Sequence, residues 1–155
     1  MNRTVRALKR TIPRTSVPAE NFVQIQQLLA RCAAALDMGD LGTWVACFAK
    51  DGEFGSAGAD EAVRPAFLVQ GHDALLEQAR LMTSGPVGYH WNADPVLELT
   101  DEGMSGLSFF MFVLAPEGRG EIAVAGHYVD DYVHRDGSWL IARRIVHTSR
   151  DFNQP

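Results

Sequence analysis

The sequence predicts an α+β fold in which N-terminal helices pack on a strongly curved, mainly antiparallel sheet and form a conical pocket. Apolar residues recur at helical spacing in the first part of the 155-residue chain, whereas long β-type runs follow Pro86. The links between these runs are too short for a crossover helix, so neighbouring strands are expected to be antiparallel. The length and the 46% content of hydrophobic residues are typical of one folded domain.

Three helices are expected before the long strands. Apolar residues recur every three or four positions over about residues 18–36, which predicts the strongest amphipathic helix of the chain. Asp40 is a suitable N-cap for a second, short helix that ends near residues 50–52. A third helix is expected over residues 73–82, with Asp73 as its cap.

Two short strands are expected at residues 53–56 and 66–70, with a loose loop between them. Four longer strands are expected at residues 89–99, 107–115, 121–134 and 138–148. Turn residues separate these four strands, namely Asp101-Glu-Gly103, Pro116-Glu-Gly118 and Arg135-Asp-Gly137. We therefore expect the four long strands to form an antiparallel meander.

The net charge of −5 argues against a general nucleic-acid-binding protein, because phosphate binding needs clustered cations. The charge is nevertheless uneven, since residues 1–14 carry five Lys or Arg residues and no acid. We interpret residues 1–17 as a basic N-terminal arm and residues 18–155 as the folded domain. No apolar run is long enough for a membrane span or a secretory signal, so no membrane association and a cytoplasmic location are expected.

The sequence carries no familiar cofactor motif. Cys32 and Cys47 lie inside apolar helical patterns and are expected to be buried, reduced thiols. The five histidines do not have the spacing of metal ligands on one helix face. The glycine-rich segments match neither nucleotide-binding loops nor a serine-hydrolase motif. We therefore expect an activity that needs neither a metal nor an organic cofactor.

Three ionisable residues are candidates for the pocket. Asp37 ends the first helix directly after its apolar stripe, and His90 opens the first long strand among aromatic residues. Strand alternation puts Arg143 and Arg144 on opposite faces, so one of them must point inward. An inward arginine needs an anion or a ligand oxygen.

Each candidate also has a structural interpretation. A carboxylate after a helix is often solvated or a cap, and a strand histidine is often a satisfied structural residue. Arg144 can pair with Asp130 or Asp131 on the neighbouring strand.

Several segments together resemble the SnoaL-like branch of the nuclear transport factor 2-like superfamily, over about residues 20–150. They are residues 25–37, Asp40-Leu-Gly-Thr-Trp44, Phe48-Ala-Lys-Asp51, Gly71 at a helix start, Tyr89-His90, and the segment from Asp130-Asp-Tyr132 to Arg144. This branch consists of small α+β cone proteins and includes scytalone dehydratase, hexachlorocyclohexane dehydrochlorinase and a bile acid dehydratase. The resemblance implies an Asp–His dyad at Asp37 and His90, and a pocket arginine at Arg144.

The chain departs from these enzymes at other positions. The second histidine of scytalone dehydratase would fall near Phe112 or Val113, and a tyrosine of the bile acid enzyme falls near Cys32. The substrate is therefore not specified by the resemblance.

The resemblance implies a lyase that removes water from a small hydrophobic ring compound. His90 would move the proton, and Asp37 would orient the imidazole. Arg144 or Asn92 would hold a carbonyl or enolate oxygen. The expected apolar lining is Trp44, Phe48, Phe54, Leu68, Phe110, Phe112 and Tyr128.

Two alternatives remain open at this point. An isomerase or polyketide-cyclase-like enzyme would use Asp37 as its base. A non-catalytic small subunit or ligand-binding protein would share the fold without the chemistry. The exposed face of the long strands carries Ile, Val and aromatic residues, and the resembled family is usually dimeric or trimeric, so a homo-oligomer is expected.

Deleting residues 1–14 is expected to leave the melting temperature unchanged, because this charged segment has no apolar face to bury. Thermal unfolding followed by circular dichroism checks this. A large fall in melting temperature would contradict it.

Overall fold

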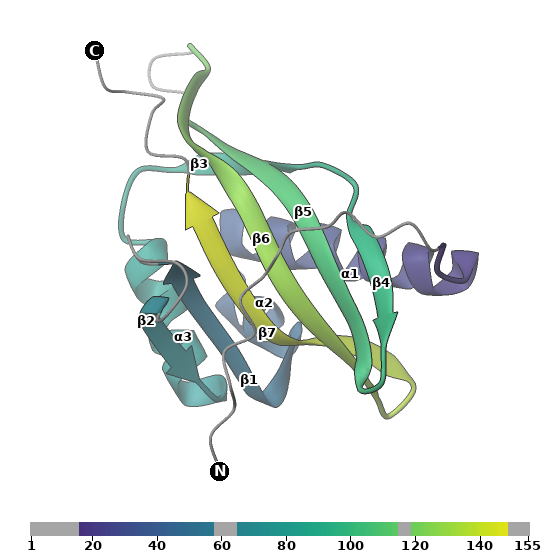
Figure 1. Cartoon of the computed structure of the whole chain (residues 1–155). Coiled ribbons are helices and arrows are strands. Elements are labelled where there is room, and N and C mark those ends of the chain that lie inside the picture. Colours follow the sequence, from purple (N-terminus) through teal and green to yellow (C-terminus); the bar gives the residue numbers. More distant parts are fainter. Residues whose placement is uncertain (1–15, 58–64, 115–118, 149–155) are drawn as a thin grey trace.

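The protein is described here by a computed structural model covering residues 16–57, 65–114 and 119–148 (Figure 1). The α+β prediction is confirmed. The elements are α1 (Ala19–Asp37), α2 (Leu41–Ala46), β1 (Phe48–Ala57), β2 (Pro65–Gln70), α3 (His72–Met82), β3 (Gly88–Asn92), β4 (Val96–Thr100), β5 (Gly103–Leu114), β6 (Glu121–Arg135) and β7 (Ser138–Thr148). Residues 1–15 of the expected basic arm lie outside the described residues, and so do residues 58–64 of the expected loop.

The strands form one sheet whose order is β2-β1-β7-β6-β5-β3, with β4 also paired to β5. Strands β5, β6 and β7 form the expected antiparallel meander. Strand β1 joins the sheet in parallel beside β7, a long-range pairing that the sequence did not predict. Figure 1 shows α1 and α2 behind the sheet, so the helices cover one of its faces.

The strand predicted over residues 89–99 is in fact two strands. Asn92 pairs with Phe110 in β3, whereas Val96 pairs with Leu107 in β4, so one extra residue lies between the two paired segments. Pro95 has no backbone N–H and cannot continue the ladder. The extra residue reverses which side chains face inward, and therefore Leu97 is buried in β4 while His90 and Asn92 face inward in β3.

The second and third helices also differ from the prediction at one end. Helix α2 ends at Ala46 instead of near residues 50–52, because Phe48 already pairs with Ile141 of β7. Its N-cap is Asp40 as predicted, and the Asp40 carboxylate accepts a 3.1 Å hydrogen bond from the backbone N–H of Thr43. The N-cap of α3 is Gly71, at a φ of 85° that favours glycine, and Asp73 lies in the first turn instead.

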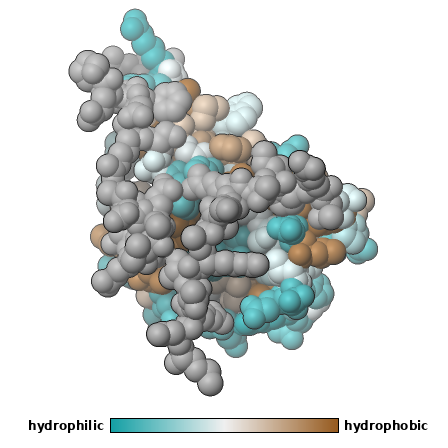
Figure 2. Space-filling view, in the orientation of Figure 1, coloured by the Kyte–Doolittle hydropathy of each residue, from teal (hydrophilic) through white to brown (hydrophobic). Residues whose placement is uncertain are grey.

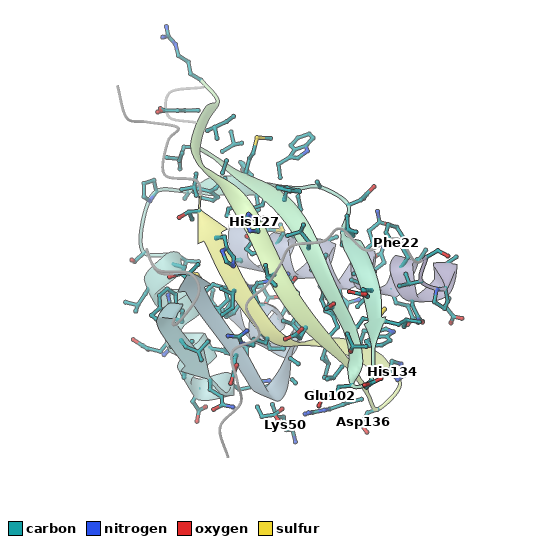
Figure 3. All side chains as sticks on the ribbon, viewed as in Figure 1. Phe22, Lys50, Glu102, His127, His134 and Asp136 are labelled. Atoms are coloured by element: carbon teal, nitrogen blue, oxygen red, sulfur yellow. The ribbon has the colours of Figure 1, made fainter. Side chains whose placement is uncertain are left out.

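The β6–β7 connection is the two-residue turn that the sequence indicates. Arg135 pairs with Ser138, and the residues between them, Asp136 and Gly137, have φ values of 50° and 78°. Positive φ at both positions is typical of a type I′ hairpin, whose twist matches that of the strands. Figure 3 shows Asp136 at the end of this hairpin.

The core lies between the helices and the inner face of the sheet. The apolar stripe of α1 is buried there and consists of Ile25, Leu28, Leu29, Cys32 and Ala35. Phe48 packs against Trp44 and Phe54 with ring centroids 4.8 and 6.3 Å apart. Cys32 and Cys47 are both buried and free, as predicted.

The face of the sheet opposite the helices carries exposed aromatic residues. Tyr89, Trp91 and Phe109 are 62%, 71% and 57% exposed, and they alternate with inward-facing residues of β3 and β5. Figure 2 views the molecule from this side, and the coloured residues that remain in view are both hydrophobic and hydrophilic. No helix in the described segments is long and apolar enough to cross a membrane.

Self-association through this face stays a prediction. Light scattering of the dilute protein is expected to give a dimer or trimer of the 17.0 kDa chain. Replacing Trp91 with Asp should shift the mass towards the monomer, because a charge would be buried at the interface. The control Leu81→Asp changes an exposed apolar residue of α3 and should not alter the mass. A wild-type monomer would contradict the prediction.

Candidate active site

Helix α1 lies along β3 and runs in the opposite direction. Two turns after its start, Gln26 donates a 2.8 Å hydrogen bond from Nε2 to Oδ1 of Asp94, just after β3. At its end, Asp37 contacts His90 near the start of β3. These two contacts fix the register of the helix against the strand, and so the last residue of α1 meets the first inward-facing side chain of β3.

Asp37 and His90 form a hydrogen-bonded pair. The ring Nδ1 of His90 lies 2.5 Å from Oδ1 of Asp37, and the backbone N–H of His90 donates a 2.7 Å hydrogen bond to Oδ2. An ionised carboxylate only accepts, so the ring proton belongs on Nδ1 and the Nε2 lone pair is left for another group. The side chains are only 16% (His90) and 8% (Asp37) exposed.

The position of Asp37 is unfavourable for the helix itself. Asp37 is the last residue of α1, whose final turn contains no basic residue. A carboxylate near a helix C-terminus is repelled by the helix dipole. The two hydrogen bonds from His90 offset this repulsion. A locally unfavourable residue held by a specific partner is typical of functional sites.

A cavity of about 510 Å³ lies next to the pair, between the helices and the sheet. Its lining residues are Cys32, Ala33, Leu36, Asp37, Met38, Gly39, Trp44, Phe54, Met82, Thr83, Gly85, Pro86, Val87, Gly88, His90, Asn92, Phe110, Phe112, Val124, Tyr128, Arg144, Val146 and Thr148. The wall is mostly apolar, with a few polar groups, as in sites for small organic molecules.

Two of the residues expected in the apolar lining do not line this cavity. Phe48 is 1% exposed and lies in the core, in contact with Trp44 and Phe54. Leu68 is 44% exposed on the edge strand β2. The remaining predicted site residues all belong to the cavity wall.

Sequence reasoning missed several lining residues. Val124 and Val146 lie an even number of residues from Tyr128 and Arg144, so the two-residue period of a strand could have indicated them. Ala33 lies one helical turn before Asp37 and could have been found in the same way. The loop from Thr83 to Val87 has no periodic pattern, and no sequence signal places it at the cavity.

Arg144 is buried at the cavity wall and is paired with Asp130. Its Nε and Nη2 donate hydrogen bonds of 2.8 Å each to the two carboxylate oxygens of Asp130. Burial acts against the charge, but the carboxylate and its hydrogen bonds raise the pKa of Arg144 well above its usual range. The anion that the inward arginine needs is therefore Asp130, whereas Arg143 pairs with Glu53.

The two buried thiols are not arranged as a nucleophile and its base. A hydrogen bond with Cys47, together with burial, raises the pKa of Cys32, the thiol that lines the cavity. Cys32 therefore stays a protonated thiol at neutral pH. In the part of the chain that the structure describes, no group of three or more His, Cys, Asp or Glu side chains is arranged to hold a metal ion.

The comparisons with known proteins concern the family and the fold of the chain. The model of the SnoaL-like domain family matches residues 18–145. Rv3472 of Mycobacterium tuberculosis, whose function is unknown, shares 28% identity with a TM-score of 0.75, and the match covers 88% of this chain and 76% of that one. None of the curated proteins matches the chain.

Two solved structures from Novosphingobium aromaticivorans show likeness of fold. One is provisionally named a scytalone dehydratase, with 22% identity, a TM-score of 0.69 and coverage of 88% of this chain and 90% of that one. The other is provisionally named the beta subunit of an aromatic-ring-hydroxylating dioxygenase, with 19% identity, a TM-score of 0.72 and coverage of 84% and 90%.

Replacing Asp130 with Asn is expected to lower the free energy of unfolding by about 3–5 kcal/mol, because Arg144 would remain buried without its counter-charge. Urea unfolding measures the change. Asp51→Asn is the matched control, since it removes a carboxylate whose partner Arg135 is exposed, and it should have little effect. Equal effects of the two substitutions would contradict the prediction.

Proposed function

Because the chain belongs to the SnoaL-like domain family, we propose that it is a cofactor-independent lyase that removes water from a small hydrophobic ring compound. The catalytic pair in this proposal is Asp37 and His90. The observation that carries it is the hydrogen bond from the ring of His90 to Asp37 beside an apolar cavity of about 510 Å³. The likeness to the protein provisionally named scytalone dehydratase supports the same class of reaction.

In the proposed reaction, Nε2 of His90 removes a proton from a carbon atom next to an activating group. The electron pair of the broken C–H bond forms a C=C bond, and the C–O bond to a hydroxyl group breaks. The leaving hydroxide takes the proton back from His90 and departs as water. Asp37 keeps the imidazole in the required tautomer and stabilises the imidazolium that forms between the two steps.

The geometry favours His90 over Asp37 as the base. Both carboxylate oxygens of Asp37 already accept hydrogen bonds from His90, one from the ring and one from the backbone. Nε2 of His90 is the ring atom that this arrangement leaves for a substrate. The alternative isomerase or cyclase, in which Asp37 is the base, would need these hydrogen bonds to be given up.

The second alternative is a non-catalytic subunit or ligand-binding protein, as the likeness to a protein provisionally named a dioxygenase beta subunit suggests. Such a subunit does not need an open cone. A cavity of about 510 Å³ with a polarised histidine in its wall supports an enzyme instead.

The proposal predicts that His90→Ala lowers turnover by about 10³-fold or more without loss of folding. Asp37→Asn should cause a similar loss, and the double variant should be little worse than either single one, because the two residues act as a unit. The assay follows the loss of one water molecule by mass spectrometry, for a panel of hydroxylated bicyclic ketones.

His134→Ala is the matched control for this experiment. His134 is an exposed histidine of β6 that does not line the cavity, so wild-type turnover is expected after its removal. A His90→Ala variant with wild-type turnover would exclude the proposed mechanism.

A further inference from the structure

Tyr128 on β6 carries a hydroxyl group that the fold itself does not use. Its side chain is 7% exposed and lines the cavity. Within the described segments, no residue forms a hydrogen bond with its hydroxyl. Tyr132, two residues later, differs in this respect, because its hydroxyl donates a 2.7 Å hydrogen bond to Asp130. The hydroxyl is not among the buried polar atoms that lack a partner, so it stays accessible, and Tyr128 lines the cavity. A ligand in the cavity could therefore be its hydrogen-bond partner.

The ring of Tyr128 is held in place from both sides. Phe110 of β5 stacks on it with a centroid distance of 4.4 Å and an interplanar angle of 15°. Arg144 of β7 lies over the ring, with its Cζ 4.2 Å from the ring centroid. Since β6 lies between β5 and β7, the two contacts come from opposite neighbours. The direction of the hydroxyl is therefore fixed before a ligand binds.

The hydroxyl is a hydrogen-bond donor at neutral pH. Burial raises the pKa of Tyr128 above its usual range. The charge of Arg144 acts in the opposite direction, and the Asp37 carboxylate contributes to the rise. The effect of Asp37 on Tyr128 is consistent with both groups lining one cavity. A phenol that keeps its proton beside a cation is a good donor to an oxygen on which negative charge develops.

The lining residues that the structure describes offer no unpaired Lys or Arg to an acidic ligand. Arg144 is the one Lys or Arg among the described lining residues, and Asp130 neutralises it. The remaining charged lining residue, Asp37, would repel a carboxylate or a phosphate. The chemistry of the wall therefore suits a neutral ligand that presents a hydrogen-bond acceptor to Tyr128.

We propose that Tyr128 binds the carbonyl oxygen of the substrate, and that the substrate is a neutral cyclic ketone. The catalytic part of this inference rests on the proposed function. When His90 takes the proton from the carbon next to the carbonyl, the electron pair moves to the carbonyl oxygen, and the hydroxyl of Tyr128 stabilises the enolate. The carbonyl then reforms as the C=C bond forms and the hydroxide leaves with the proton from His90, so that water is released.

The test is a binding experiment that does not depend on turnover. The probes are 2-tetralone, a neutral bicyclic ketone with a ¹³C-labelled carbonyl, and tetralin, the hydrocarbon of the same ring system. In the wild-type protein the carbonyl stretch of bound 2-tetralone is expected to be lower than in an apolar solvent, as a hydrogen bond requires. Tyr128→Phe should return the stretch towards the apolar-solvent value and raise the Kd of 2-tetralone about three- to tenfold, with the Kd of tetralin unchanged.

Tyr132→Phe is the matched control, because it removes the same group from another buried tyrosine of β6 outside the cavity wall. It should lower the melting temperature through the lost hydrogen bond to Asp130 and leave the carbonyl stretch unchanged. Tyr128→Phe should instead keep the melting temperature, since its hydroxyl has no partner in the described part of the fold.

The two proposals fail separately. An unchanged carbonyl stretch in Tyr128→Phe, or no binding of 2-tetralone to the wild-type protein, would overturn the role of Tyr128 even if His90→Ala abolishes turnover. A His90→Ala variant with wild-type turnover would overturn the dyad, while a shifted carbonyl stretch would still support Tyr128 as the ligand's donor.

Discussion

The buried ion pair between Arg144 and Asp130 determines how the cavity wall is built. The Arg144 side chain is only 6% exposed, and such a charge is costly to bury unless it is paired and its donors are satisfied; both oxygens of Asp130 accept hydrogen bonds from it. The hydroxyl of Tyr132 donates a further hydrogen bond to the Asp130 carboxylate, and Arg144 lies over the ring of Tyr128. The pair thus uses the hydroxyl of one tyrosine for stability and orients the ring of the other towards the cavity.

The second constraint is the position of α1 along β3. The helix is held near its middle by the Gln26–Asp94 hydrogen bond and at its end by the Asp37–His90 pair. The apolar stripe of α1 provides the burial that fixes the helix on the sheet. The two polar contacts determine which residues of α1 lie beside which residues of β3. A shift of one residue along the helix would move the Asp37 carboxylate away from His90.

Much of this arrangement could be predicted because periodicity reports which face of an element is buried. The apolar stripe of α1 and the alternation of side chains along β7 are local signals. The structure confirms both, because the stripe is buried and Arg143 and Arg144 pair with different carboxylates. The pairing of β1 with β7 joins residues about 90 positions apart, as in Glu53 and Arg143, and no local pattern specifies it.

The errors have equally local causes. Cys47, Phe48 and Ala49 are all buried, so their run of apolar residues fits a continued helix as well as the first residues of a strand. Because of the same ambiguity, the sequence prediction placed Phe48 in the cavity wall, whereas the structure places it in the core, in contact with Trp44. The surroundings of Asn92 could not be predicted from the sequence. The Oδ1 atom of its side chain is buried and has no hydrogen-bond partner among the described residues, and Asn92 lines the same cavity as Tyr128. An unsatisfied buried polar group costs about 1–3 kcal/mol of stability, and this cost depends on the three-dimensional surroundings of Asn92, which no local sequence pattern reports.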